Sequence, residues 1–183
     1  INSGGKLVDG GFDLTVTGTL LVNGTYSGAA TPGRLIMTGA GATIGGTGTI
    51  NNANRLDIST GNKTILSTAN LTFTGTTARI DIRSGITVTN NGSITLKRIT
   101  GADATSIWIN AANGTTSVSE DLLAIGTLTA TAVGNTVNYI GSIAQTVKTA
   151  AYYNLAYSGA NTGTLAAATT VNGNLNIGSG GTL

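Results

Sequence analysis

Short runs in which apolar and polar residues alternate recur along the whole chain. A four-residue phrase whose second and fourth residues are apolar occurs as DLTV (13–16), RLIM (34–37), RLDI (55–58), RIDI (79–82), SIWI (106–109), TLTA (127–130), NLAY (154–157) and NLNI (174–177). Its leading apolar residues are Leu14, Leu35, Leu56, Ile80, Ile107, Leu128, Leu155 and Leu175. A period of two is typical of a strand with one buried face, so each phrase predicts a short β-strand.

The regular spacing of these strands predicts a parallel β-helix, or β-solenoid. A base step of roughly 21 residues that lengthens now and then is expected where the strands of successive coils are fixed and the loops vary. Further alternating runs, TLLV (19–22), GITV (85–88) and SITL (93–96), give each coil two or three strands. The phrases therefore predict an all-β rod of about eight coils, stacked about 4.8 Å apart over about 40 Å, which we expect to be right-handed.

Alternation also predicts which side chains fill the core. The leading apolar residues of the first five phrases should form one buried column: Leu14, Leu35, Leu56, Ile80 and Ile107. The residues that follow them should point outward: Thr15, Ile36, Asp57, Asp81 and Trp108. A β-sandwich is the alternative, because short strands with frequent turn signals also suit that fold. A sandwich, however, has no reason to repeat one phrase in step.

Composition favours strands and excludes several kinds of chemistry. Of 183 residues, 40% are hydrophobic, 9% charged and 4% aromatic, with 28 Gly and a single Pro, which predicts one domain with a core and many short strands. Together with the repeated phrases, this predicts one β-solenoid segment over residues 1–183. A net charge of +2 with dispersed Lys and Arg does not predict the basic stripe that nucleic acid requires. The chain has no Cys and no His, which excludes thiolate and imidazole chemistry. No apolar run approaches the roughly 18 residues of a membrane span.

The last part of the chain resembles a known type of bacterial surface protein. NTVNYIGSIAQTVKTAAYYNLAYSG (135–159) and TTVNGNLNIGSGGTL (169–183) resemble the repeat units of large secreted surface proteins and adhesins of Bacteroidota. The match is centred on Tyr152, Tyr153, Asn154 and Leu155. The Gly, Thr and Asn texture of the whole chain is more loosely similar to filamentous-haemagglutinin-type β-helical adhesins. The resemblance implies an extracellular protein of tandem units displayed on a bacterial cell surface, without catalytic residues.

Two charged phrases are candidates for a site. RLDI and RIDI are successive phrases of the coil, so Arg55 should stack near Arg79 and Asp57 near Asp81 on neighbouring coils. Two carboxylates this close could act as an acid/base pair or hold Ca²⁺, but alternating charges that balance one another on the surface are the better interpretation. GGTGTI (45–50) has Thr49 where a calcium-binding turn has Asp. We therefore expect no metal, no cofactor and no enzyme activity.

Two aromatic residues are candidates for ligand contact. Trp108 is in the outward position of its phrase, where it could stack on a sugar ring or lie under a neighbouring loop. Tyr152 should point outward, whereas Tyr153 and Tyr157 share the face of Leu155 and should fill the core or a corner.

Three functions remain open from the residues alone. We favour a structural repeat in an extracellular fibre or stalk. The alternative is an adhesin module that binds glycans or surfaces through Trp108, Tyr152 and the Arg and Asp positions. A β-helical polysaccharide lyase or glycosidase is less favoured, because the seven acidic residues are scattered.

The two ends of the sequence are alike. IGSGGTL (177–183) matches INSGGKL (1–7) at five positions, which gives a candidate repeat of about 176 residues. Neither end carries a polar or charged cap, and natural rods need one to protect their last strands. We therefore expect the partners of this chain to be identical or similar units, joined end to end within one chain or as a head-to-tail polymer.

Overall fold

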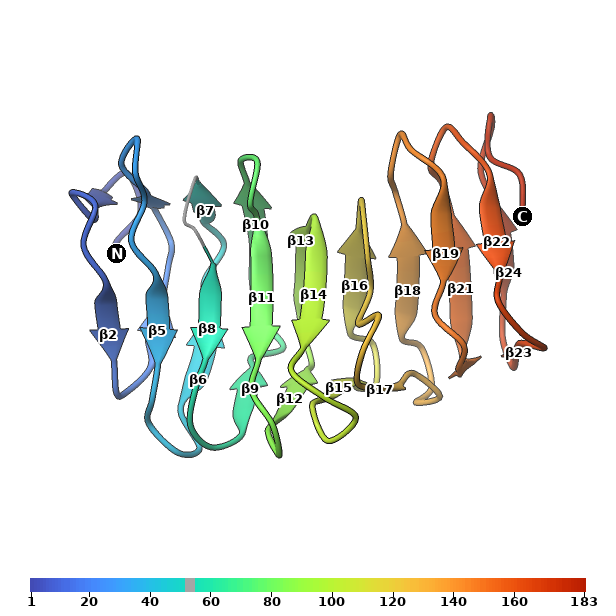
Figure 1. The fold of residues 1–183 in the computed structure, drawn as a ribbon, viewed down its shortest axis with the longest axis horizontal. Helices are drawn as coiled ribbons and strands as arrows, with labels where there is room; N and C mark the ends of the chain where they lie inside the picture. Colours follow the sequence, from blue (N-terminus) through green and yellow to red (C-terminus); the bar gives the residue numbers. More distant parts are fainter. Residues whose placement is uncertain (52–54) are drawn as a thin grey trace.

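The chain forms a β-solenoid of about eight turns (Figure 1). The computed structural model describes residues 1–51 and 55–183. In these residues there is no helix, and each of the strand pairings is parallel. The predicted fold class is therefore confirmed, and the β-sandwich alternative is wrong, because sandwich sheets are antiparallel.

Each of the first five turns contributes one strand to each of three long sheets. The nine-stranded sheet contains β1(Lys6–Val8), β4(Thr25–Ser27), β7(Thr49–Asn51), β10(Asn70–Thr74), β13(Ser93–Leu96), β16(Thr115–Val118), β18(Thr136–Tyr139), β21(Asn154–Tyr157) and β24(Leu175–Ile177). The five-stranded sheet contains β2(Leu14–Val16), β5(Leu35–Met37), β8(Leu56–Ile58), β11(Arg79–Ile82) and β14(Arg98–Gly101). The six-stranded sheet contains β3(Leu20–Leu21), β6(Thr43–Gly45), β9(Lys63–Ile65), β12(Thr87–Asn90), β15(Ile107–Asn110) and β17(Thr127–Thr129).

Two short sheets take over near the C-terminus, where the five- and six-stranded sheets stop. β19(Gln145–Val147) pairs with β22(Gly163–Leu165), and β20(Ala151–Tyr152) pairs with β23(Thr170–Val171). The nine-stranded sheet alone runs from one end of the molecule to the other (Figure 1). Its eight steps of about 4.8 Å give a length of about 38 Å, close to the predicted value.

The predicted core column is confirmed at four of its five positions. Leu14, Leu35, Leu56 and Ile80 lie opposite one another on neighbouring strands of the five-stranded sheet, and the last three are fully buried. The next member is Ile99, not Ile107. Ile107 lies in the six-stranded sheet, where it faces Thr87 and Thr127. The prediction for Ile107 was wrong because its phrase lies on a different side of the coil.

The two aromatic residues predicted to point outward are buried. Trp108 and Tyr152 each have 0% of their surface exposed. In β15 the inward residues are Trp108 and Asn110, so the alternation has the opposite phase to the one predicted. The indole Nε1 of Trp108 donates to the hydroxyl of Thr116 at 3.1 Å, and the hydroxyl of Tyr152 donates to the carbonyl of Lys148. Each polar tip thus has a partner inside the rod, which offsets the cost of complete burial. Tyr157 is buried as predicted, and Tyr153 is half-buried.

A ladder of buried amides connects successive coils in the middle of the rod. Asn90, Asn110 and Asn135 are all 0% exposed. Asn90 donates through Nδ2 to Oδ1 of Asn110 at 3.0 Å, and Nδ2 of Asn110 lies 3.4 Å from Oδ1 of Asn135. The side chain of Asn110 also donates to the carbonyl of Thr136 at 2.9 Å. Because each amide satisfies groups on the next coil, this ladder fixes the register of neighbouring coils.

One carboxylate joins the turns of the first two coils. Asp9 accepts hydrogen bonds from the backbone N–H groups of Gly11 at 2.8 Å, Ala29 at 2.9 Å and Gly33 at 3.1 Å. The hydroxyl of Tyr26 donates to the same carboxylate at 3.3 Å. Burial acts to raise the pKa of Asp9, but these hydrogen bonds to the charged form outweigh it, so the pKa is lowered.

The edge strands of the rod carry exposed apolar side chains. Leu7 and Val8 of β1 are 42% and 50% exposed, and Leu175 and Ile177 of β24 are 52% and 44% exposed. None of the described residues belongs to a helix that is long and apolar enough to cross a membrane. The repeat length inferred from the two ends of the sequence stays a prediction.

Candidate binding surface

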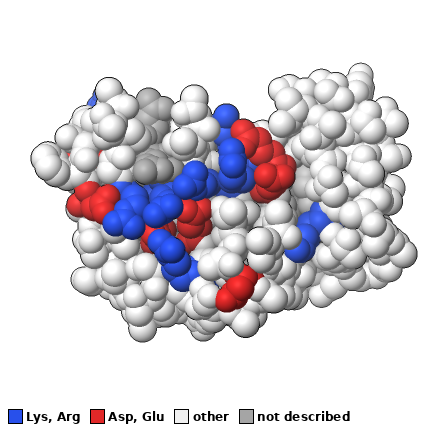
Figure 2. All heavy atoms as spheres, viewed as in Figure 1, with Lys and Arg blue, Asp and Glu red and all other residues white. Residues whose placement is uncertain are grey.

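All five arginines of the chain gather on the outer side of the five-stranded sheet (Figure 2). Arg79 is opposite Arg98, and Arg55 precedes β8 in the same register, because Leu56 pairs with Ile80. Arg34 precedes β5 at the equivalent position, and its carbonyl accepts from the N–H of Leu14. The arginine row consists of Arg34, Arg55, Arg79 and Arg98. Arg83 follows β11 on the same side.

This clustering corrects the expectation that Lys and Arg are dispersed. The arginines are dispersed in sequence but not in space, because the coil returns an arginine to the same place once in each of four turns, whereas Lys97 is the one lysine that joins their ion pairs in the described residues. The signal was present in the phrases RLIM, RLDI, RIDI and RITG, which all begin with Arg. Sequence reasoning singled out Arg55 and Arg79 and missed Arg34, Arg83 and Arg98.

The acidic residues occupy the neighbouring outward position. Asp57 pairs with Asp81, which confirms the predicted stacking of these two carboxylates on adjacent coils. Ile36 and Thr100 continue the same line at either side. A row of arginines therefore lies beside a short row of carboxylates, as the charge-balance interpretation predicted.

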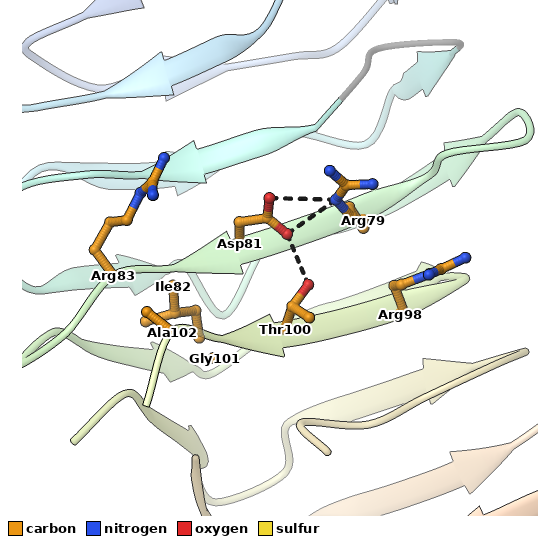
Figure 3. A pocket seen from close by; sticks show the side chains of 8 residues that line it. All are labelled: Arg79, Asp81, Ile82, Arg83, Arg98, Thr100, Gly101 and Ala102. Atoms are coloured by element: carbon orange, nitrogen blue, oxygen red, sulfur yellow. Dashed lines mark hydrogen bonds and ion pairs between the residues drawn. The ribbon is translucent and has the colours of Figure 1, made fainter. Parts of the chain in front are cut away.

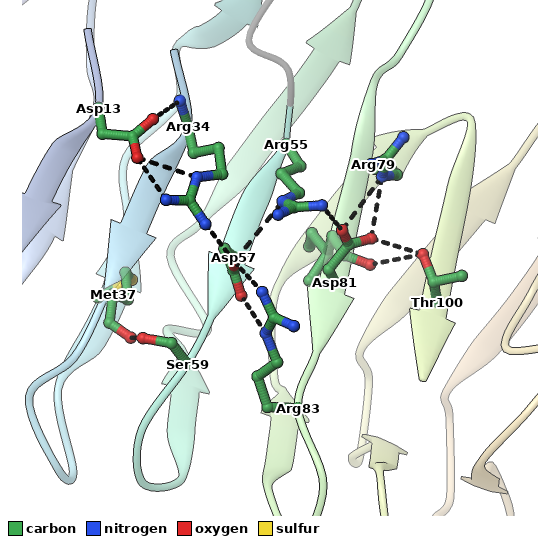
Figure 4. A network of polar contacts seen from close by, with 11 residues as sticks. Asp13, Arg34, Met37, Arg55, Asp57, Ser59, Arg79, Asp81, Arg83 and Thr100 are labelled. Atoms are coloured by element: carbon green, nitrogen blue, oxygen red, sulfur yellow. Dashed lines mark hydrogen bonds and ion pairs between the residues drawn. The ribbon is translucent and has the colours of Figure 1, made fainter. Parts of the chain in front are cut away.

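Asp57 is the centre of the polar network (Figure 4). Its carboxylate accepts from Nε of Arg83 at 2.9 Å and from Nη2 of the same residue at 2.6 Å. Arg34 and Arg55 approach it to 3.7 Å and 3.6 Å. The Asp57 side chain is only 1% exposed, which corrects the expectation that it is open to solvent. It does lie on the outer side of the sheet, but the arginine side chains cover it. This bidentate hydrogen bond raises the pKa of Arg83.

The other carboxylates on this side are also paired with arginine. Asp81 accepts from Nε of Arg79 at 3.0 Å and lies 3.3 Å from Nη1 of Arg55. Asp13 accepts hydrogen bonds from Nε and Nη2 of Arg34 at 2.9 Å and 2.5 Å, and these hydrogen bonds lower the pKa of Asp13. They raise the pKa of Arg34 in turn.

Glu120 closes the network at the end of the five-stranded sheet. Its carboxylate is 3.2 Å from Nζ of Lys97 and 2.5 Å from Nη2 of Arg98. The network of ion pairs thus combines five Arg and one Lys with three Asp and one Glu, and 6 − 4 leaves an excess of +2 within this network.

A hollow of about 270 Å³ opens in this surface (Figure 3). Its lining includes Arg79, Asp81, Arg83, Arg98 and Thr100. Arg83 lies at one end and Arg79 and Arg98 at the other, with Asp81 and Thr100 between them (Figure 3). The hydroxyl of Thr100 donates to Oδ1 of Asp81 at 2.7 Å. The arrangement brings guanidinium groups, a carboxylate and a hydroxyl to one small opening.

The candidate residues from the sequence divide into two groups. Arg55, Asp57, Arg79 and Asp81 are brought together in one network, and two of them line the hollow. Trp108 and Tyr152 lie in the interior and are not part of this surface. In residues 1–51 and 55–183, no three acidic side chains are grouped so that they could hold a metal ion.

Comparisons of the chain with protein-family models, with curated proteins and with solved structures found no match. The function therefore has to be inferred from the rod and from its charged surface.

Proposed function

We propose that the chain is a structural segment of an extracellular bacterial fibre or stalk, in which the stiff rod itself is the function. The observation that carries this proposal is the nine-stranded sheet, which runs the whole length of the described coils in unbroken parallel register. Backbone hydrogen bonds run along the rod axis from coil to coil, so bending the rod would require breaking or compressing them.

The interior supports a rigid rod rather than a soft one. The core contains fully buried Leu, Ile, Val and aromatic side chains from all three long sheets. Tyr139 stacks on Tyr157 of the next coil with ring centroids 6.4 Å apart. The amide ladder adds directional bonds that a purely apolar core lacks.

The proposed partners are further coils at each end, supplied by the same chain or by a second molecule. The exposed apolar side chains of β1 and β24 support this part of the proposal, because an added coil would bury them. The extracellular bacterial location rests on the resemblance of residues 135–159 and 169–183 to surface repeats. The proposal includes no catalytic role.

Antibodies raised against residues 1–183 test this proposal on intact cells of the source organism. We expect them to label unpermeabilised cells and, in electron micrographs, to mark thread-like projections. Labelling that appears only after permeabilisation, or that marks compact particles, would contradict the proposed role.

An adhesive role is the second candidate, and one observation favours it. A stiff spacer does not need the arginine-lined hollow for its stability, because exposed ion pairs contribute only about 0 to 1 kcal/mol each. A hollow that stability does not require favours a role in binding.

A further inference from the structure

We propose that the hollow between Arg79, Arg83 and Arg98 binds the oxyanion group of an acidic polysaccharide, a carboxylate or a sulfate, together with hydroxyl groups of the same sugar. This proposal does not rest on the structural role, because a rod can carry a binding surface or lack one. It rests on the donors, acceptors and size of the hollow.

The three guanidinium groups are only partly used within the protein. A guanidinium has five N–H donors. Arg79 uses Nε alone, toward Asp81, and Arg83 uses Nε and Nη2 toward Asp57. Arg98 reaches Glu120 through Nη2, while its Nε is buried and has no hydrogen-bond partner in the described protein. The unused Nη donors of these partly exposed side chains are available to an anionic ligand, which guanidinium groups bind in a bidentate manner, whereas the buried Nε of Arg98 is out of a ligand's reach.

The side chains are fixed but remain accessible. Arg79, Arg83 and Arg98 keep 24%, 46% and 35% of their side-chain surface exposed. Each is held by a carboxylate of the protein, so less rotamer entropy is lost when a ligand binds. Pre-organised guanidinium groups of this kind favour a ligand with charges at definite positions.

The acceptors in the hollow favour a sugar over a bare anion. Asp81 would repel phosphate or sulfate alone, but its carboxylate can accept hydrogen bonds from sugar hydroxyls. The oxygen of Thr100, which donates to Asp81, can accept another such bond. A ligand that is anionic and hydroxylated satisfies both kinds of group. The volume of about 270 Å³ lies just below the range of pockets that enclose drug-sized molecules, which suits one sugar unit.

The charge density favours a polysaccharide over nucleic acid. The arginine row spans four coils, or about 14 Å, and its network of ion pairs has an excess of only +2. Double-stranded DNA carries about eight negative charges over that distance. The outward positions of the five-stranded sheet carry no aromatic side chain, on which single-stranded bases could stack. A polymer with one charge per sugar matches the sparse excess better.

A second hollow provides an internal comparison. It measures about 300 Å³ and is lined by one acidic and one basic residue, Asp121 and Lys148, with apolar and small polar neighbours. It has no arginine and no excess charge, so we expect no acidic sugar to bind there.

Titration calorimetry of residues 1–183 with defined oligosaccharides tests the proposal. The ligands are an oligogalacturonate, a sulfated oligogalactan and a neutral oligoglucan of equal length, with inorganic sulfate and a DNA duplex as further probes. We expect one acidic oligosaccharide or both to bind, and the tighter one identifies the oxyanion as carboxylate or sulfate. The neutral glucan, sulfate and DNA should bind at least tenfold more weakly.

Two variants locate the binding. Arg79→Gln with Arg98→Gln should weaken it at least tenfold. Ala102→Glu adds a carboxylate at the exposed rim and leaves the arginine pairs intact, so it should weaken binding similarly in a folded protein. The matched control Lys6→Gln with Lys148→Gln removes two positive charges away from the hollow and should change affinity less than twofold. No binding of either acidic ligand, or equal weakening by the control, would overturn the proposal.

Discussion

Replacing Asn110 by Ala should destabilise the middle of the rod strongly. The Asn110 amide is fully buried and takes part in five hydrogen bonds. Its Nδ2 donates toward Gly114, Asn135 and Thr136, and its Oδ1 accepts from Asn90 and from the hydroxyl of Thr116. The substitution removes all five bonds at once.

The expected loss follows from the groups that remain without a partner. Asn90 keeps two other acceptors for its Nδ2, and the carbonyl of Gly114 keeps the N–H of Thr136. The hydroxyl of Thr116 loses its acceptor and Oδ1 of Asn135 loses its donor. Each buried group left in this way costs about 1–3 kcal/mol, so we expect Asn110→Ala to lower the free energy of unfolding by about 2–6 kcal/mol.

Two assays are suitable: amide hydrogen exchange, which detects local opening, and urea denaturation, which measures global stability. In a solenoid each coil contacts only its neighbours, so destabilisation can appear as local opening before global unfolding. We expect faster exchange in β12, β15 and β18 and a lower urea midpoint. The control is Asn70→Ala, at an exposed position in β10, which should change stability by less than about 0.5 kcal/mol. If Asn110→Ala matches this control, the amide ladder does not hold the coils in register.

Three further predictions concern stability. Leu56→Ala leaves a cavity at a fully buried position of the core column and should lower the free energy of urea unfolding by about 2–5 kcal/mol. A decrease below about 1 kcal/mol would contradict close packing at this position. Asp57→Asn leaves its arginines without a full counter-charge and should lower the free energy of urea unfolding by about 1–3 kcal/mol. This loss is smaller than that for breaking a wholly buried ion pair, because the guanidinium groups can turn toward water. The folded-state pKa of Asp9 is lowered. The contribution of Asp9 to folding stability is therefore fully present above the unfolded pKa of about 3.9, and it is lost as the pH falls through the folded-state pKa. Asp9→Asn should therefore reduce the dependence of stability on pH in that acidic window, and an unchanged dependence would refute this role.

The coil was predictable from the sequence because its strands repeat a simple pattern at a nearly constant step. Leu14, Leu35, Leu56 and Ile80 each lead one of these repeated phrases and do form one column. Ile99 escaped prediction because RITG ends in Gly101 instead of a second apolar residue.

The phase of the alternation could not be predicted for the aromatic residues. A strand of period two has two possible inward faces, and the corners of the coil decide between them. In β15 the corner turns Trp108 and Asn110 inward, where Thr116 and the neighbouring amides satisfy their polar groups. Patterns that count only apolar residues as core place Asn110 outside.

The charged surface was half predictable. Arg55, Asp57, Arg79 and Asp81 follow from one repeated phrase, and their stacking is confirmed. The hollow depends on Arg83 and Arg98, which come from a loop after β11 and from a strand without the full phrase. Only the register of the coils shows that these residues meet.

Small-angle X-ray scattering of a lengthened rod tests the central claim most directly. Thr25 and Thr49 are in register, so three additional copies of residues 25–48 inserted after Gly48 would add three whole coils. If each coil adds one strand spacing to a stiff rod, the maximum dimension increases by about 14 Å and the cross-sectional radius of gyration is unchanged. A particle that becomes thicker without lengthening by this amount would contradict the account.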